Sequence, residues 1–186
     1  MIHFNTIKWK NFLSTGNAWT EVKLDHSPST LIVGENGSGK STMLDALTFA
    51  LFNKPFRTVS KPQLINTING KNCLVEINFN IGSKNYTITR GLQPRVFDIL
   101  INGDMLDKNA NIRDFQKYLE ENILKLNYKS FTQIVMLGSA SFTPFMQLHL
   151  GARREIIEDI LDISIFTSMN AVLKGKLTQL ENDKRI

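Results

Sequence analysis

Cysteine is nearly absent from this chain, because Cys73 is the only one among 186 residues. A single thiol cannot form a disulfide within the chain, which fits a reducing compartment. Long apolar runs are absent too, since no stretch reaches the roughly 18 residues that a bilayer crossing needs. The opening residues MIHFNTIKWKNF carry none of the features of a secretion signal. We therefore expect a cytoplasmic protein that does not enter a membrane.

Histidine is scarce, and no metal-ligand spacing connects His3, His26 and His149. Neither a Ser-His-Asp arrangement nor a catalytic pair of carboxylates can be argued from spacing. Repeats, low-complexity tracts and Pro/Gly-rich linkers are missing as well, so we expect one continuous lobe over residues 1–165. The formal charge of +5 favours an acidic partner such as nucleic acid.

The spacing of apolar residues predicts an α/β fold. Strands are expected at Ile2–Trp9, Trp19–Leu24, Thr30–Val33, Leu74–Asn80, Tyr86–Arg90, Val96–Ile101 and Phe131–Leu137, the third of them short and buried. Helices are expected at Lys40–Phe52, Asp114–Leu124 and Ala152–Leu161, and from Phe166 onward. Asn102-Gly103 favours a tight hairpin turn, so the strands between residues 74 and 101 should form an antiparallel meander.

The last predicted helix has a coiled-coil pattern. Met169, Leu173, Leu177 and Leu180 recur at steps of four, four and three, and polar or charged residues occupy most of the positions between them. Such spacing places the apolar side chains along one seam. We expect residues 166–186 to be the start of a coiled coil.

A phosphate-binding loop is the clearest functional signal. The segment GENGSGKS, Gly34–Ser41, fits G-x-x-x-x-G-K-[ST] between an apolar segment and an amphipathic helix. Its glycines let backbone N–H groups point at phosphates, assisted by the helix N-terminus. The pattern predicts ATP contacts from Gly34, Glu35, Asn36, Gly37, Ser38, Gly39, Lys40, Ser41 and Thr42.

Three of these residues have distinct expected roles. Lys40 would reach the β and γ phosphates and is the catalytic candidate. The Ser41 hydroxyl would ligate Mg²⁺, and Thr42 would contact the α phosphate. The expected cofactors are therefore ATP and Mg²⁺.

The other parts of an ATPase site are not recognisable. Glu76 follows an apolar run, but the alternation continues through Phe79, so Glu76 is interpreted as a solvated strand residue rather than a metal-holding acid. Glu158-Asp159 lies inside a helical pattern. The serine-glycine stretch Leu137–Ser141 is followed by Pro144, which favours a loop over the start of a helix. The sequence thus predicts half of a site, and the segment alone should be nearly inactive as an ATPase.

Basic residues form three groups, which are Lys54, Arg57 and Lys61, then Arg90 and Arg95, then Arg153-Arg154. Each group can be an ordinary solvated surface or part of a surface that follows a DNA backbone. The Arg153-Arg154 pair can equally hold a partner protein. The sequence leaves these interpretations open.

Taken together, the motifs resemble the N-terminal lobe of SbcC-type DNA double-strand-break repair ATPases, relatives of the structural-maintenance-of-chromosomes proteins, and particularly the phage recombination endonuclease subunits of that type. The resemblance rests on Lys10-Asn11-Phe12, Gly34–Ala46, Tyr86–Arg90, Phe131-Thr132, Phe142, Phe145 and Arg153–Leu161. It implies an ABC-ATPase-like head with a phosphate-loop NTPase fold, in the host cytoplasm if the chain is phage-encoded.

The resemblance also implies partners. A C-terminal lobe of the same protein, joined through the coiled coil, would bring the metal-binding acids and the signature helix. A second copy of the head would complete an ATP sandwich, and a metal-dependent nuclease subunit would bind near the base of the coil and act on double-stranded DNA.

Two positions depart from the family pattern. A glutamine usually touches Mg²⁺ after the strand that Phe131-Thr132 opens, and Ser139 stands at that position while Gln133 lies earlier. Leu13 stands where an arginine often contacts the nucleotide, which leaves Ser14 and Thr15 as candidate contacts.

Two other functions stay open. A small phosphate-loop kinase would have a similar length, although antiparallel strands precede the loop here and no arginine-rich lid follows it. A chromosome-organising head would bind DNA without a nuclease subunit. Phosphoryl-transfer assays distinguish the first, and a pull-down of a nuclease subunit distinguishes the second.

Overall fold

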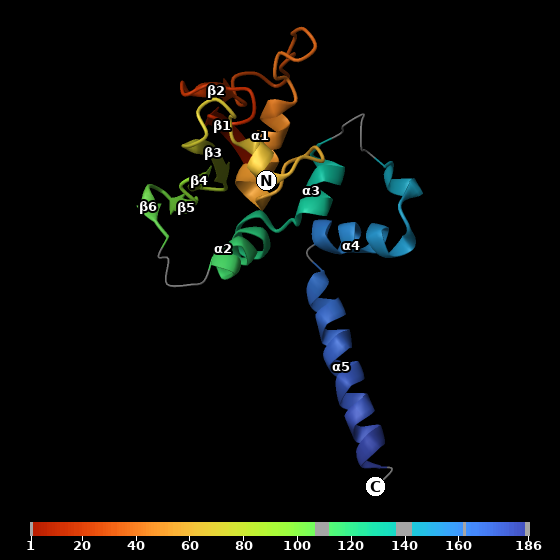
Figure 1. The fold of residues 1–186 in the computed structure, drawn as a ribbon. Coiled ribbons are helices and arrows are strands. Elements are labelled where there is room, and N and C mark those ends of the chain that lie inside the picture. The colour runs from red at the N-terminus through yellow and green to blue at the C-terminus, as the bar shows by residue number, and fades with distance from the viewer. Residues whose placement is uncertain (1, 107–111, 137–142, 162, 185–186) are drawn as a thin grey trace. The chain divides into compact units, whose positions relative to one another are not determined.

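The computed structural model describes residues 2–106, 112–136, 143–161 and 163–184 (Figure 1). Its contacts divide the chain into two units, one up to Leu124 and one from Lys125 onward. The first unit contains β1 (Ile2–Lys10), β2 (Thr20–Lys23), α1 (Thr42–Phe52), the 3₁₀ turn η1 (Lys61–Leu64), β3 (Cys73–Ile81), β4 (Lys84–Leu92), β5 (Val96–Ile101), β6 (Asp104–Met105), α2 (Ile112–Tyr118) and the π-helical turn η2 (Leu119–Leu124). The second contains α3 (Tyr128–Ile134), the 3₁₀ turn η3 (Phe145–Gln147), α4 (Leu150–Ile160) and α5 (Ser164–Asp183).

One antiparallel sheet of six strands, in the order β2-β1-β3-β4-β5-β6, forms the frame of the first unit. The strands from β3 to β6 are the predicted meander, which is confirmed. Asn102 and Gly103 turn β5 into β6 with φ angles of 54° and 92°. Positive φ at both central residues gives a turn whose twist matches that of the flanking strands, and glycine adopts it at little cost.

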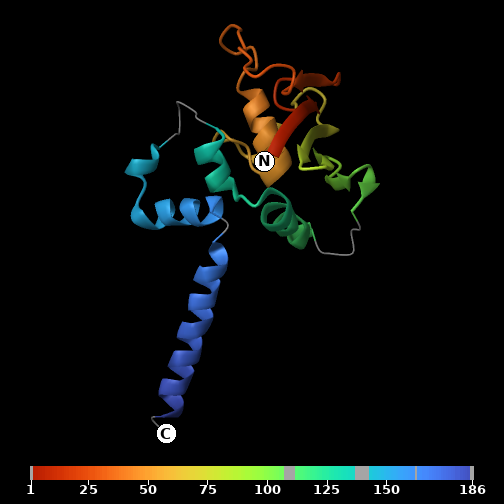
Figure 2. The ribbon, with the colours of Figure 1, turned by 180° about the vertical axis from the view of Figure 1, so that it is seen from behind.

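The core lies between this sheet and α1. Alternate residues of β3, Cys73, Val75, Ile77 and Phe79, are fully buried. Helix α1 contacts β1, β3 and β4 on the sheet, and Figure 2 shows it beside the strands from behind. Burying one large apolar side chain contributes about 2 kcal/mol, so this face of the sheet explains much of the unit's stability.

The predicted helix at Lys40–Phe52 is confirmed as α1. It is buried along most of its length because the sheet covers one side and η2 contacts another. Helix α1 ends at Asn53, whose left-handed φ of 57° lets its N–H bond to the carbonyl of Phe49. The predicted helix at Asp114–Leu124 is also present, as α2 followed directly by η2.

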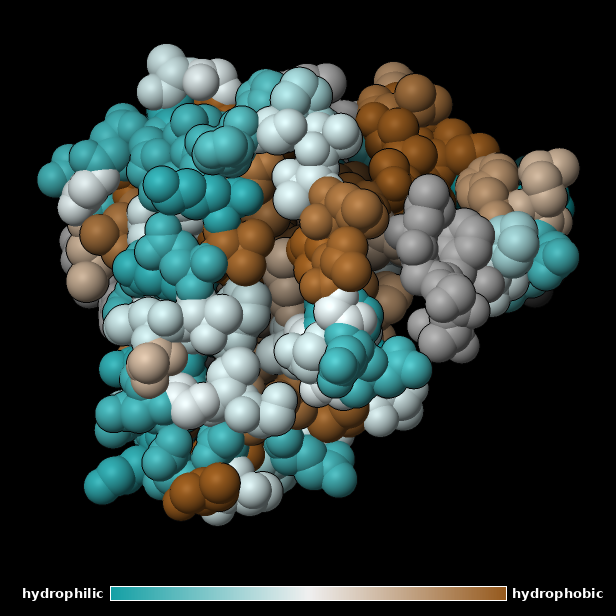
Figure 3. All heavy atoms as spheres, turned by 90° about the horizontal axis from the view of Figure 1, so that it is seen from above, coloured by the Kyte–Doolittle hydropathy of each residue, from teal (hydrophilic) through white to brown (hydrophobic). Residues whose placement is uncertain are grey.

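The prediction of a buried strand at Thr30–Val33 is wrong. This segment has no regular secondary structure, and Leu31 and Val33 are 87% and 82% exposed. A strand needs a neighbour for its backbone hydrogen bonds, and no described strand lies beside this segment. Figure 3 shows that hydrophobic and hydrophilic residues are both exposed on the face seen from above.

The prediction of a strand at Phe131–Leu137 is also wrong, because residues 128–134 form helix α3. Asn127 caps this helix by accepting a hydrogen bond from the N–H of Ser130 at 2.9 Å. Asp159 of α4 accepts hydrogen bonds from the side chains of both Asn127 and Ser130, each at 2.5 Å. Contacts with α4 therefore favour helix over strand in an apolar run that allows either. Residues 137–142, with the predicted loop there and Ser139, lie outside the described residues.

The predicted helices at Ala152–Leu161 and from Phe166 onward are confirmed as α4 and α5. The apolar side chains of the proposed seam on α5 are exposed, among them Met169, Leu173, Leu177 and Leu180. The division into a lobe over residues 1–165 and a coiled coil from residue 166 stays a prediction. Among the described residues, none of the helices combines the length and apolarity that a bilayer crossing requires.

Candidate nucleotide-binding site

The loop over residues 34–42 has the backbone of a phosphate cradle. Gly37 and Gly39 have φ angles of +88° and +94°, where other residues are strained. A β-carbon added at Gly34 would lie 2.6 Å from the Oγ of Ser38, so the Ser38 side chain would have to turn away to admit it. Both features keep the backbone compact and leave its N–H groups accessible to an anion.

Helix α1 begins at the end of this loop. The N–H of Thr42 bonds to the carbonyl of Gly39 at 2.9 Å. Ser41 occupies the N-cap position but makes no capping hydrogen bond with its side chain. The free N–H groups of the first turn and the positive end of the helix therefore face the cradle, and the Ser41 hydroxyl is not used in capping the helix.

Lys40 folds back over the loop. Its Nζ donates to the carbonyl oxygens of Gly34 at 2.5 Å and Glu35 at 2.6 Å. Phosphate oxygens carry a negative charge and form stronger hydrogen bonds with an ammonium group than carbonyl oxygens do. A triphosphate in the cradle would draw Lys40 away from one or both carbonyls.

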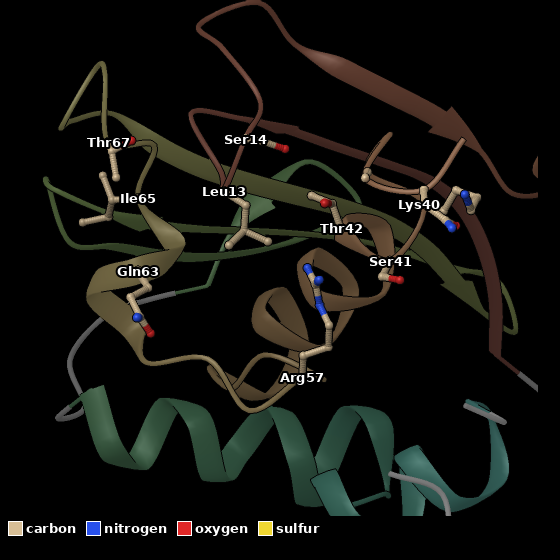
Figure 4. Close-up of a pocket in the computed structure, with 12 residues that line it drawn as sticks. Leu13, Ser14, Lys40, Ser41, Thr42, Arg57, Gln63, Ile65 and Thr67 are labelled. Atoms are coloured by element: carbon tan, nitrogen blue, oxygen red, sulfur yellow. The ribbon is translucent and has the colours of Figure 1, made fainter. Parts of the chain in front are cut away.

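A pocket of about 530 Å³ opens beside the cradle, a size typical of ligand sites. Its lining consists of Leu13, Ser14, Asn36, Gly37, Gly39, Lys40, Ser41, Thr42, Arg57, Gln63, Ile65 and Thr67. In Figure 4, Lys40 and Ser41 lie at one end and Gln63, Ile65 and Thr67 at the other. The first end has charged and hydroxyl groups of the kind that bind phosphates, and the second combines the apolar side chain of Ile65 with the polar side chains of Gln63 and Thr67.

Most of the residues predicted from the sequence meet in this pocket, namely Ser14, Asn36, Gly37, Gly39, Lys40, Ser41 and Thr42. Gly34, Glu35 and Ser38 belong to the loop but not to the lining. Thr15 is also outside the lining, and its hydroxyl donates to the carbonyl of Phe12 at 2.6 Å. Direct contact of each residue with a nucleotide stays a prediction.

Five lining residues were not predicted as contacts: Leu13, Arg57, Gln63, Ile65 and Thr67. Arg57 belongs to a basic group in the sequence, but the sequence did not predict that it contacts a nucleotide. At Leu13 the sequence signal is a departure from the family pattern, which predicts no contact for the leucine itself. Gln63, Ile65 and Thr67 lie within η1 or just after it, in a segment with no motif, so no sequence signal pointed to them.

Arg57 reaches the pocket because Asp45 holds it. Asp45 lies on α1 and is fully buried. Its carboxylate accepts hydrogen bonds from the backbone N–H of Arg57 at 2.9 Å and from Nε at 2.7 Å, and Nη2 completes the ion pair at 2.5 Å. The Arg57 side chain remains 46% exposed. A buried anion thus fixes a cation on the wall of the pocket that Ser41 also lines (Figure 4).

Asn11 links the loop that follows β1 to the segment over residues 66–72. Both lie at the end of the pocket away from Lys40 (Figure 4). It is 1% exposed, and its Nδ2 donates to the Oδ1 of Asn17 at 3.0 Å and the carbonyl of Asn72 at 3.2 Å. Its Oδ1 accepts from the Nδ2 of Asn69 at 2.7 Å. Its carbonyl accepts from the N–H of Asn66 at 2.9 Å. The buried Asn11 therefore joins its own loop, up to Asn17, to the stretch from Asn66 to Asn72.

Asn66 extends this network to the pocket wall. Its Nδ2 donates to the carbonyl of Leu13 at 3.1 Å, and the N–H of Leu13 bonds to the carbonyl of Leu64 at 2.7 Å. Phe12 and Ile65 form an isolated antiparallel bridge between the same loops. The positions of Leu13 and Ile65, which form the apolar part of the lining, are therefore coupled.

We expect Asn11→Ala to weaken ATP binding about tenfold and leave binding of tripolyphosphate unchanged, because the loss of the three side-chain hydrogen bonds loosens only the end of the pocket formed by Leu13 and Ile65. Calorimetry with both ligands in the presence of Mg²⁺ measures the difference. Asn80→Ala is the matched control, since it removes a part-buried amide whose partner, Asn85, lies on the sheet. Equal losses for both ligands, or no loss of ATP affinity, would contradict a positioning role.

The fold and this pocket define a phosphate-loop nucleotide-binding lobe. The family model described as "AAA domain" matches residues 6–186, and the chain belongs to that family.

Curated relatives agree with this assignment. The chain is 43% identical over 182 residues to "Exonuclease subunit 2" of Escherichia phage RB69, covering 98% of this chain and 32% of that protein. It is 46% identical over 171 residues to "Exonuclease subunit 2" of Enterobacteria phage T4, covering 92% and 30%. It is 28% identical over 177 residues to the SbcC component of the nuclease SbcCD of Lactococcus lactis, covering 84% and 17%. The predicted resemblance to SbcC-type proteins is confirmed, and the chain spans about a third of the length of the phage relatives.

The solved structures support the fold. An Smc head domain from Pyrococcus furiosus, with an extended coiled coil and bound to the C-terminal domain of ScpA, aligns with a TM-score of 0.59 at 20% identity. The alignment covers 98% of this chain and 48% of that one. The predicted α/β fold of an ABC-ATPase-like head is therefore confirmed.

Proposed function

We propose that this chain is the N-terminal, ATP-binding lobe of a DNA-repair ATPase that works with a nuclease subunit. In this proposal, ATP-driven pairing of two heads controls the access of the nuclease to double-stranded DNA ends. The cradle at residues 34–42 supports ATP binding, and the names of the relatives, an exonuclease subunit in two phages and a component of the nuclease SbcCD, support the nuclease. The proposed location is the cytoplasm, of the host if the chain is phage-encoded.

The observation that carries this proposal is the exposure of the cradle and of the apolar segment that precedes it. The cradle residues are mostly exposed, and the apolar segment Thr30–Val33 leading into them has no strand beside it among the described residues. Uncovered apolar surface next to a functional loop is typical of an interface. We infer that a C-terminal lobe, from the two thirds of the relatives' length that this chain does not span, pairs with Thr30–Val33 and brings the metal-binding acids.

The bound groups would be ATP and Mg²⁺. Mg²⁺ neutralises the charge that develops on the β and γ phosphates and orients them. Ser41 would hold the ion through its hydroxyl, while Lys40 would bind the β and γ phosphates. Thr42 would contact the α phosphate from the first turn of α1. Ser139 would be a second metal contact, because it stands at the position where the family usually carries a metal-contacting glutamine.

The remaining partners follow from the proposed architecture. Residues 166–186 would begin a coiled coil, and the metal-dependent nuclease subunit would bind near its base. The exposed apolar residues of α5, from Phe166 to Leu180, support this because a helix with an uncovered apolar seam packs against another helix. A second copy of the head would cover the γ-phosphate end of the pocket.

The isolated chain tests the proposal. We expect it to bind ATP weakly and to hydrolyse it hardly at all, because the acid and the second head are missing. Phosphate release in excess Mg²⁺ measures this turnover, and adding the C-terminal lobe should raise it. Strong turnover by residues 1–186 alone would rule out a shared site.

A further inference from the structure

A second hollow of the first unit is lined by cations and is separate from the nucleotide pocket. Its volume is about 410 Å³, and it is lined by Asn53, Lys61, Arg90, Gly91, Leu92, Arg95, Val96, Phe97 and Asp98. None of these residues lines the nucleotide pocket. The cations come from η1, from β4 and from the turn between β4 and β5. The fold therefore brings together charges that are far apart in the sequence.

Arg90 is the fixed part of this cavity. It is 4% exposed, and its Nε donates to the carbonyl of Ala50 at 2.9 Å and its Nη2 to the Oε1 of Gln116 at 2.6 Å. Its guanidinium carbon lies 3.7 Å from the centre of the Phe97 ring. Burial lowers the pKa of Arg90 to about 9, while Glu120 opposes this shift. At neutral pH the group therefore stays charged and is held in one orientation.

Lys61 and Arg95 differ from Arg90 because both are exposed. Within the part of the chain that the structure describes, neither side chain has a hydrogen bond or an ion pair. Burial lowers the pKa of Lys61, and the charges of Arg90, Arg95 and Lys54 lower it further. The positive charges around Lys61 are therefore close enough to repel one another.

Acidic groups nearby are fewer than the cations. Asp98 lines the cavity, and Glu120 interacts with Arg90 from η2. On the positive side, Lys61, Arg90 and Arg95 line the cavity, and the charge of Lys54 also acts on Lys61. The excess positive charge would be stabilised by an anion, and guanidinium groups offer several N–H donors in a plane that suits phosphate oxygens.

We propose that this cavity binds a backbone phosphate of DNA. The proposal rests on the proposed function, in which the protein acts on DNA, and it adds the residues that hold the strand. Arg90 forms the fixed base of the site, and Lys61 and Arg95 contact the phosphate from the exposed rim. Nucleic acid fits better than a small free anion because the rim residues are exposed, so a strand crossing the surface can reach both.

The test measures binding of the chain to a short fluorescent DNA duplex by anisotropy over a range of salt concentrations. We expect Lys61→Ala/Arg95→Ala to bind about tenfold more weakly at low salt. The magnitude of the slope of log K against log salt should fall by about one, because the two side chains contact the same phosphate and each neutralised phosphate contributes about one. Both residues are exposed, so the thermal unfolding of the variant should match that of the parent chain.

Lys84→Ala is the control. It removes one exposed cation at the opposite end of β4, six residues or about 20 Å from Arg90, and we expect it to keep DNA affinity nearly unchanged. An equal loss in Lys84→Ala and in each single variant, Lys61→Ala and Arg95→Ala, would mean that only the overall charge matters and would overturn the proposal.

Two further measurements separate this proposal from others. ATP affinity should be the same in Lys61→Ala/Arg95→Ala as in the parent chain. This measurement therefore tests the nucleotide site independently of the DNA site. Inorganic phosphate, added at constant ionic strength, should compete only weakly with the duplex. If phosphate shifts the NMR signals of Lys61 and Arg95 while DNA affinity is unchanged in the variant, the cavity is a small-anion site and the DNA proposal is wrong.

Discussion

Lys40→Ala is expected to abolish ATP binding without unfolding the chain. The Lys40 side chain bonds only to carbonyls of its own exposed loop, Gly34 and Glu35, and packs into no core. In the nucleotide complex the same ammonium would form charge-assisted bonds with phosphate, each contributing about 2 kcal/mol. Losing two of them weakens binding by about 3 orders of magnitude.

Calorimetry with ATP and Mg²⁺ measures this change, and far-UV circular dichroism monitors the fold. Lys84→Ala is again the control because it removes a lysine from the sheet. An unchanged ATP affinity in Lys40→Ala would refute the assigned role. A lower unfolding temperature with unchanged affinity would instead mean that the lysine mainly stabilises the loop.

The second large effect is expected at the ion pair between Asp45 and Arg57. Arg57→Ala leaves a fully buried carboxylate with only the backbone N–H at residue 57 as a partner. An uncompensated buried charge is costly, and we expect the free energy of unfolding to fall by about 3 kcal/mol. Asp45→Ala should cost less, because the half-exposed Arg57 guanidinium can turn to water.

Urea denaturation of the two single variants and the double variant measures this difference. We expect Arg57→Ala to be the least stable of the three, and Asp45→Ala/Arg57→Ala to recover part of the loss because no buried charge remains. Additive losses in this cycle would mean that the two side chains stabilise the fold independently. Lys8→Ala is a surface comparison, since its pair with Glu76 is partly exposed at 2.7 Å and should contribute less than about 1 kcal/mol.

Local patterns were enough to predict the phosphate loop, α1 and the meander. The glycines at 37 and 39 and the turn at Asn102-Gly103 have conformations that depend on a few neighbouring residues. Alternation in β3 predicted its buried face correctly, because a strand on a one-sided core keeps a period of two. In such places the sequence constrains the backbone before any tertiary contact forms.

Short apolar runs were where prediction failed. Thr30–Val33 and Phe131–Leu137 are equally compatible with a strand, a buried helix or an interface, and only neighbouring elements decide between them. The far wall of the pocket was missed for a related reason. Ile65 and Thr67 reach the site through the hydrogen bonds of Asn11 and Asn66, and a network of amides has no periodicity to detect.

The exposure of Thr30–Val33 also affects how the protein can be made. An uncovered stretch rich in β-forming side chains is a template for pairing with other chains. If the covering lobe is translated later from the same message, at about 5 to 20 residues per second, the segment stays open while the rest of the polypeptide leaves the ribosome. A chaperone that shields this stretch during synthesis, or a lysine introduced beside Leu31 for recombinant work, would limit aggregation until the partner lobe arrives.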